Sequence, residues 1–115
     1  MNKILNILIL VISINLNAQI NKSKPLMFNI HKTLVNIEKI STQNLQVSLN
    51  CNIIEKVDSN YYWVKDNSGK MKVIILPKLI SNITNYNIND VFNIIVKVKD
   101  VNNNIFIVDE IKINN

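Results

Sequence analysis

The residues with the clearest chemical potential are gathered in one short stretch, NYYWVKDNSGKMKVIIL, at positions 60–76. This stretch contains the only tryptophan of the chain, its only glycine and two of its three tyrosines. Side chains on a strand alternate between two faces. If two strands pair here, one face carries two aromatic rings and three ammonium groups, which suit stacking on a base or sugar and attraction of an anion. We therefore predict a ligand-binding face made of Tyr61, Trp63, Lys65, Lys70 and Lys72.

The same residues also have a purely structural interpretation. Aromatic residues are common cross-strand partners on an exposed sheet face, and lysines near a hairpin tip keep an edge soluble. The segment at 30–40 or the preceding residues could also cover Trp63. The distinction depends on register, because a slip of one residue turns Tyr62 outward and Trp63 inward. In the predicted register, Ile74 projects outward together with the lysines.

Signatures of catalysis and of cofactor binding are absent from the sequence. The single histidine, His31, has no paired carboxylate nearby in the sequence and is expected on the surface. No GxSxG or HExxH motif occurs, and one glycine cannot make a glycine-rich phosphate loop. The single cysteine, Cys51, cannot form a disulfide within the chain, and no cysteine–histidine metal spacing exists. We predict a protein that is not an enzyme and uses no cofactor or metal.

The elements that position the candidate face are strands. Apolar residues alternate with polar ones in five segments, and the doublet Ile53-Ile54 interrupts the alternation, which indicates a bulge. A turn at 58–60 and a loop at 66–69 join the first three strands, with the glycine supplying a positive φ at the loop exit. The predicted strands are Val47–Ile53, Tyr61–Lys65, Met71–Leu76, Val91–Lys99 and Ile105–Ile113.

Two helical segments complete the pattern. Apolar residues recur every three or four positions over 30–44, which predicts a short amphipathic helix. A similar spacing follows Pro77 within 77–90 and predicts a short helix or helical turn between the third and fourth strands. Together these elements predict a mainly β fold, a five-stranded Greek-key barrel of the OB-fold type.

The first eighteen residues have the layout of a signal peptide. Lys3 precedes an apolar run from Ile4 to Ile14, and a polar stretch with the small residue Ala18 follows. The run is short for a bilayer span, although an uncleaved anchor is the alternative. We predict cleavage after Ala18, a flexible lead-in at 19–29, one OB-fold domain at 30–115, no membrane span in the mature chain, and a periplasmic or secreted location.

The charge of the chain is positive. Its formal net charge is +5, and all 13 basic residues are lysines. Removal of residues 1–18 takes away Lys3 and no acid, so the mature chain would carry +4. Abundant Ile, Asn and Lys indicate AT-rich coding, so the lysine excess permits an anionic partner without requiring one.

A resemblance is carried by residues 45–113. Tyr62, Val64, Asp66, Gly69 and the alternating apolar residues after them resemble the first three strands of bacterial secreted OB-fold proteins, and DVFNIIVKVKD with IFIVDEIKI resembles their closing hairpin. The resemblance implies the OB-fold and a periplasmic protein that binds small or charged molecules on the barrel face. Cytoplasmic nucleic-acid-binding OB domains share the same spacing.

The sequence therefore predicts a non-catalytic, secreted or periplasmic binding protein. The expected ligand is a small anionic or glycan-like molecule, or a polymer, held on the face of the second and third strands. Trp63 and Tyr61 would stack on it, and Lys65, Lys70 and Lys72 would attract it. The alternatives are a domain that binds single-stranded nucleic acid on the same face, and a protein-interaction module that uses an edge of the barrel.

Overall fold

The computed structural model describes residues 24–83 and 85–114. The predicted signal peptide over 1–18 lies outside the described residues, as do residues 19–23 of the predicted lead-in.

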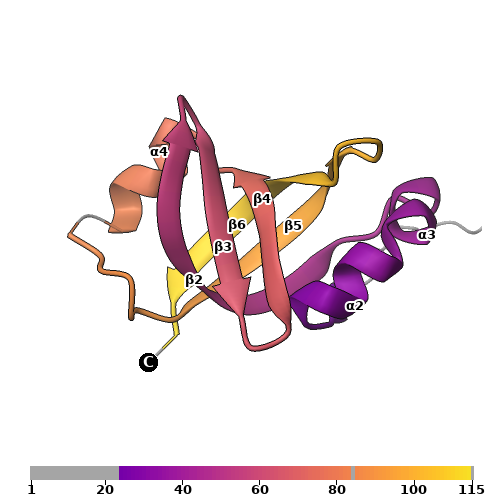
Figure 1. The fold of residues 1–115 in the computed structure, drawn as a ribbon, viewed down its shortest axis with the longest axis horizontal. Coiled ribbons are helices and arrows are strands. Elements are labelled where there is room, and N and C mark those ends of the chain that lie inside the picture. The colour runs from indigo at the N-terminus through magenta and orange to yellow at the C-terminus, as the bar shows by residue number, and fades with distance from the viewer. Residues whose placement is uncertain (1–23, 84, 115) are drawn as a thin grey trace, which may run out of the picture.

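The described chain forms a closed barrel of five strands (Figure 1). Neighbours pair antiparallel except β4 and β6, which pair parallel, and a second ladder between β2 and β5 closes the sheet. The predicted mainly β fold, a five-stranded OB-type barrel, is confirmed. The strands are β2 (Val47–Asp58), β3 (Tyr61–Asp66), β4 (Gly69–Ile74), β5 (Phe92–Asp100) and β6 (Ile105–Ile113).

The long strand β2 makes closure possible. Its first residues, Val47 to Cys51, pair with β5, and Asn52 to Asp58 pair with β3. The register shifts between Ile53 and Glu55, where the sequence predicts a bulge. A bulge bends and twists its strand, so one strand can take part in both sides of a small barrel. The strand runs five residues past the predicted end at Ile53.

The barrel interior is filled by alternate side chains of every strand, as expected for a barrel of this size. Its centre is formed by the two buried phenylalanines Phe92 and Phe106, surrounded by aliphatic side chains. Tyr62, predicted to point inward, is also buried. The remaining inward residues of β3, β4 and the residue after β4 are Val64, Met71, Val73 and Ile75, all buried.

The predicted helix over 30–44 is two short helices, α2 (Ile30–Val35) and α3 (Ile37–Thr42). Asn36 separates them with φ −108° and ψ 16°, outside the helical range. The predicted apolar spacing still faces the core, with Ile30, Ile37 and Ile40 buried. At the start of α2, Asn29 accepts a hydrogen bond from the backbone N–H of Lys32, a normal N-cap.

Short elements lie at both ends of this arrangement. Leu26–Met27, within the segment predicted as a lead-in, form strand β1, which pairs parallel with β2. The predicted helical segment after Pro77 is α4 (Pro77–Ile80), followed by a 3-10 turn over Ser81–Ile83. None of the helices in the described ranges is long and apolar enough to cross a membrane.

Candidate functional site: a basic aromatic face on the β3–β4 hairpin

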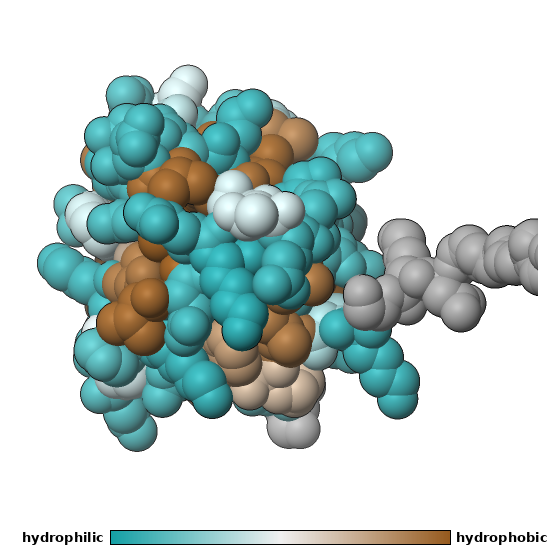
Figure 2. Space-filling view, turned by 90° about the vertical axis from the view of Figure 1, so that its right-hand side faces the viewer, coloured by the Kyte–Doolittle hydropathy of each residue, from teal (hydrophilic) through white to brown (hydrophobic). Residues whose placement is uncertain are grey.

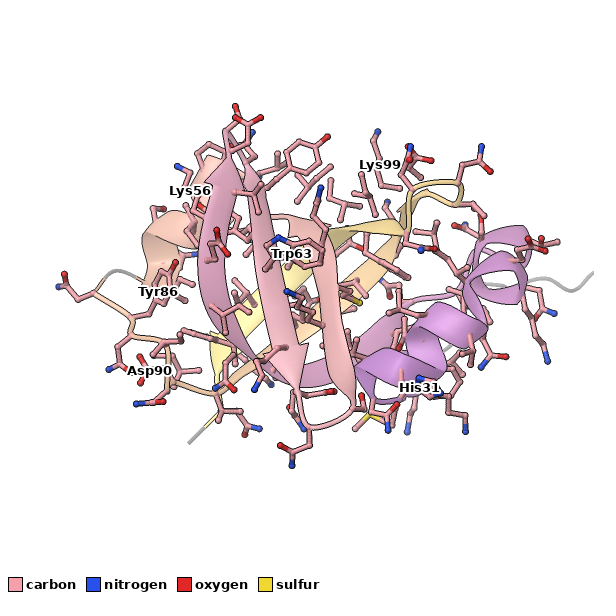
Figure 3. All side chains as sticks on the ribbon, viewed as in Figure 1. His31, Lys56, Trp63, Tyr86, Asp90 and Lys99 are labelled. Atoms are coloured by element: carbon pink, nitrogen blue, oxygen red, sulfur yellow. The ribbon has the colours of Figure 1, made fainter. Side chains whose placement is uncertain are left out.

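The hairpin of β3 and β4 has the register that the sequence predicts. Trp63 is the partner of Lys72, Lys65 is the partner of Lys70, and Tyr61 is the partner of Ile74. Tyr62 and Val64 are buried, so the residues that alternate with them on β3, namely Tyr61, Trp63 and Lys65, point out of the barrel. Figure 3 shows Trp63 lying across the outer side of this hairpin. All five predicted site residues therefore share one face.

Trp63 forms the centre of this face because two lysines approach its ring. The ammonium nitrogen of Lys70 lies 4.9 Å from the ring centroid, and that of Lys72 lies 5.5 Å from it. Both distances fall within the range of cation–π attraction, worth about 0.5–1 kcal/mol at exposed sites. The Trp63 side chain is half-buried, like that of Tyr61, so part of the ring reaches the surface. The arrangement holds two positive charges beside an accessible aromatic surface.

Lys65 adds a third positive charge at the loop end of the face. It stands directly opposite Lys70 on the neighbouring strand, and both side chains are exposed. A single salt bridge forms within the described residues, and it joins Lys97 to Asp109. None of the three lysines of this face is therefore neutralised there by an ion pair. Like charges placed directly opposite each other destabilise a sheet. The face therefore carries three lysines without an ion pair, beside one exposed carboxylate, Glu55, which is the partner of Trp63 on β2.

A pocket of about 220 Å³ opens beside the tryptophan. Trp63, Lys70 and Lys72 line it together with Met71, and two further elements complete it. Leu34 comes from α2, and Asn103 and Asn104 come from the turn between β5 and β6. In OB-folds this last turn is one of the loops that border the ligand face. The pocket combines an aromatic ring, two cations and two side-chain amides.

Sequence reasoning missed Leu34, Asn103 and Asn104. From the sequence, the asparagines indicate only coding bias and a turn, and the turn is confirmed by Asp100, which accepts hydrogen bonds from the backbone N–H groups of Asn102 and Asn103. The OB-type topology was the one signal that could have placed this turn beside the second and third barrel strands. Nothing local in the sequence links Leu34 to Trp63.

Two parts of the predicted face differ from the expectation. Ile74 was expected to project outward with Lys70 and Lys72, but its side chain is only 8% exposed. It is paired with Tyr61 on one side and with Ile107 of β6 on the other, and flanking side chains can cover it. Tyr61 is half-buried, at the end of β3 away from Lys65, and it does not line the pocket beside Trp63. The cluster is therefore centred on Trp63, with Lys70 and Lys72 closest.

The loop below the face is held by Asp66. One carboxylate oxygen accepts the backbone N–H of Ile30 at 2.9 Å, and the other accepts the N–H and hydroxyl of Ser68 at 2.7 and 2.6 Å. Burial by itself raises the pKa of Asp66, but these bonds and one from the Gly69 N–H outweigh it and hold the pKa below its ordinary value. Ser68 also accepts the N–H of His31. The loop thus anchors the start of α2 next to the face.

Other potential chemistry in the described part of the chain is limited. His31 is exposed. No group of three or more metal-ligating side chains gathers within residues 24–83 and 85–114. Cys51 is buried, and its burial, reinforced by the charge of Asp66, raises the pKa of its thiol to about 12. The hairpin face is the site on which a functional hypothesis can be built.

Comparison with solved structures supports the type of fold. No protein-family model matches the chain. No curated protein matches it either. Among solved structures, the hypothetical protein ygiW from E. coli is similar with a TM-score of 0.61 and 22% identity, covering 81% of this chain and all of that one. A structure of yeast Stn1 and Ten1 has a TM-score of 0.57 and 13% identity, covering 81% of this chain and 64% of that one. At these identities the likeness concerns the fold alone, and it agrees with the barrel topology: the chain has an OB-fold.

Proposed function

We propose that this is a non-catalytic binding protein that acts in the periplasm or outside the cell and holds an anionic or glycan-like ligand on the β3–β4 face. The observation that carries the proposal is the partly exposed ring of Trp63, with the ammonium nitrogens of Lys70 and Lys72 at 4.9 and 5.5 Å from its centroid. The pocket beside the ring gives a ligand a concave surface on which to bind.

The charges support an anionic ligand over a purely structural role for the hairpin. Lys65 and Lys70 face each other across the two strands, and this arrangement costs stability when nothing negative lies between them. A hairpin selected only for solubility gains nothing from placing two of its lysines directly opposite each other. A bound phosphate, sulfate or carboxylate relieves the repulsion, and the attraction should weaken as salt screens it.

The ring and the amides support a sugar unit in the ligand. A flat aromatic surface stacks on a base or sugar with about 1–3 kcal/mol. Asn103 and Asn104 line the same pocket, and a side-chain amide carries both donors and an acceptor for hydroxyl groups, although one N–H of Asn103 is already donated to Asp100. A sugar that carries an acidic group would use the ring, the amides and the lysines at once.

The fluorescence of Trp63 tests this directly, because it is the only tryptophan in the chain. We expect a heparin-derived tetrasaccharide or a sugar phosphate to change its emission with saturation at low salt, and neutral maltose to act more weakly. The variant K70Q/K72Q should lose about five- to tenfold in affinity, the scale of two exposed charge contacts. A matched control is K78Q/K112Q, which removes two exposed lysines elsewhere. Equal affinity of the two variants for the acidic ligand would contradict the proposal.

The second candidate is single-stranded nucleic acid on the same face. The combination of an aromatic ring with a row of lysines is how such strands are held without sequence preference. Oligothymidylate in the same titration separates the two: tighter binding than the acidic glycan, with a steep salt dependence, would favour this candidate. No response to any anion would favour a protein-interaction module instead.

The location can be tested separately from the ligand. We propose export because the sequence of residues 1–18 has the layout of a cleavable signal peptide. Sequencing the N-terminus of the purified native protein should find Gln19 first. An intact Met1 on protein from the cytosol would contradict export and would strengthen the nucleic-acid candidate.

A further inference from the structure

A second groove lies between β1 and the helix pair α2–α3, and α2 borders both this groove and the pocket beside Trp63. Its volume is about 340 Å³, larger than that of the pocket beside Trp63. Figure 2 views the molecule from the side of α2 and α3 and shows apolar side chains exposed in separate spots between hydrophilic ones. Different residues line this groove and the β3–β4 face, so a ligand of the groove is independent of the proposed function.

The groove has an apolar interior. Leu26 of β1, Phe28 just after it, Leu45 and the buried Ile40 supply its apolar lining. Leu26, Phe28 and Leu45 are only half-buried although they pack against the core. Partly exposed apolar surface of this kind gains free energy when an apolar chain covers it, about 25 cal/mol for each Å² removed from water.

The rest of the lining is polar and positively charged. Lys32, Asn36, Lys39 and Gln43 follow each other at steps of four, three and four along α2 and α3. Although Asn36 separates the two helices, all four residues line the same groove. Both lysines are exposed, none of the eight described residues that line the groove is acidic, and neither lysine forms a salt bridge within the described chain.

The charges are placed next to the apolar surface. The ammonium nitrogen of Lys32 lies 4.7 Å from the centroid of the Phe28 ring, which belongs to the apolar lining. Lys39 lies seven positions further along the chain. A ligand in this groove therefore meets an apolar surface and a positive charge within one side-chain length.

We propose that this groove binds a single-chain amphiphile with an anionic head group, an alkyl carboxylate. The alkyl chain would lie along Leu26, Phe28 and Leu45, and the carboxylate would be held by Lys32 or Lys39. Charge complementarity selects this ligand, because the two charged side chains that line the groove are both cationic. A neutral or cationic chain of equal length gains the apolar contact but not the ion pair.

Titration of the full chain with decanoate, below its micelle concentration, tests the proposal by calorimetry and by amide NMR. We expect saturable binding, with chemical-shift changes concentrated at residues 26–28 and 32–45. K32Q/K39Q should lower the affinity about five- to tenfold, and added salt should lower it in the wild type. K78Q/K112Q, which neutralises two exposed lysines elsewhere, should bind decanoate as the wild type does.

Several results would overturn the proposal. Equal affinity for decylamine or for the neutral decyl maltoside would show general apolar adhesion. Shift changes outside the groove, or equal loss in the two double-lysine variants, would do the same. The variant Phe28→Ser distinguishes the amphiphile from a second copy of the chain as the occupant of the groove. If sedimentation detects a concentration-dependent dimer and Phe28→Ser abolishes it, the groove binds a second copy of the chain.

Discussion

At the scale of single residues, Asp66 connects the hairpin loop to the helices. Its carboxylate accepts hydrogen bonds from the backbone of Ile30, 36 positions earlier, and from Ser68 within the loop. The sequence predicts the loop and its turn chemistry, because aspartate followed by a small residue and glycine is a local signal. The bond to Ile30 has no local signal, since it depends on where α2 lies relative to the hairpin.

Asp66→Asn should lower the free energy of unfolding by about 1–2 kcal/mol at neutral pH. An amide keeps one acceptor oxygen, but it cannot accept at both positions and loses the charge that strengthens the bonds. The site is only half-buried, so solvent limits the effect. Urea unfolding measures the change, and Glu110→Gln, which removes one exposed carboxylate on β6, is the control. Equal stability of both variants would contradict the role of Asp66.

The contribution of Asp66 should also depend on pH with a defined sign. Its pKa is lower in the folded state than the ordinary value of 3.8. The stabilisation is therefore fully present above the unfolded pKa and is lost as pH falls through the folded pKa. The stability difference between the wild type and Asp66→Asn should stay constant above about pH 5 and shrink in more acidic solution. A difference that grows on acidification would have the wrong sign.

Cys51 should not react in the folded protein. Its pKa of about 12 leaves almost no thiolate at neutral pH, and the side chain is only 2% exposed. In native protein, a thiol reagent should modify Cys51 only as fast as the protein unfolds. In denaturant, the same reagent should react with one thiol per chain. Fast stoichiometric modification of native protein at pH 7 would contradict this placement in the core.

At the scale of elements, the β3–β4 hairpin has an inner face that packs in the core and an outer face whose opposed lysines cost stability but can attract an anion. Its inner face follows from alternation and is confirmed, with Tyr62, Val64 and Met71 in the core. Its outer face is completed by α2 and by the turn after β5, and neither is visible from the hairpin sequence. The single helix predicted over 30–44 was wrong in one respect, because Asn36 leaves the helical conformation and divides it.

Lys65→Gln should separate binding from stability in this hairpin. It removes one of two opposed lysines, so the folded protein should gain a few tenths of a kcal/mol at low salt. If the face binds anions, the affinity for the acidic tetrasaccharide should fall by about two- to fivefold. Thermal unfolding and the Trp63 titration measure the two effects, and Lys112→Gln is the control. A gain in stability with unchanged affinity would support the purely structural interpretation of the face.

At the scale of the whole molecule, closure of the barrel depends on the seam, the region in which β6 pairs with both β4 and β5. Phe106 is fully buried, and its Cα partners are Val73 on β4 and Val98 on β5. The parallel ladder between β4 and β6 joins segments more than 30 residues apart. The topology was expected from the order of the elements, and the structure shows that the buried ring of Phe106 lies where β6 pairs with both β4 and β5.

Phe106→Ala should cost about 3–5 kcal/mol, the range for truncating a buried phenylalanine. That is a large part of the total stability of a domain of this size. Ile107→Ala on the same strand points outward and is half-buried, so it should cost clearly less. Urea unfolding compares the two. If both variants lose the same stability, the seam is not a main support of the barrel.

The sequence by itself determined the order of the strands, the turns, the inward set and the register of the hairpin, because a period of two depends only on neighbouring residues. It did not determine every strand end, since β2 runs to Asp58 and β4 spans Gly69–Ile74 instead of Met71–Leu76. It also identified Trp63, Lys65, Lys70 and Lys72 as outward residues. The tertiary structure decided that Leu34, Asn103 and Asn104 enclose Trp63, that Ile74 is covered and that a groove lies beside α2 and α3. These contacts join segments about 30 or more residues apart or depend on how helices pack, so they exist only once the barrel has closed.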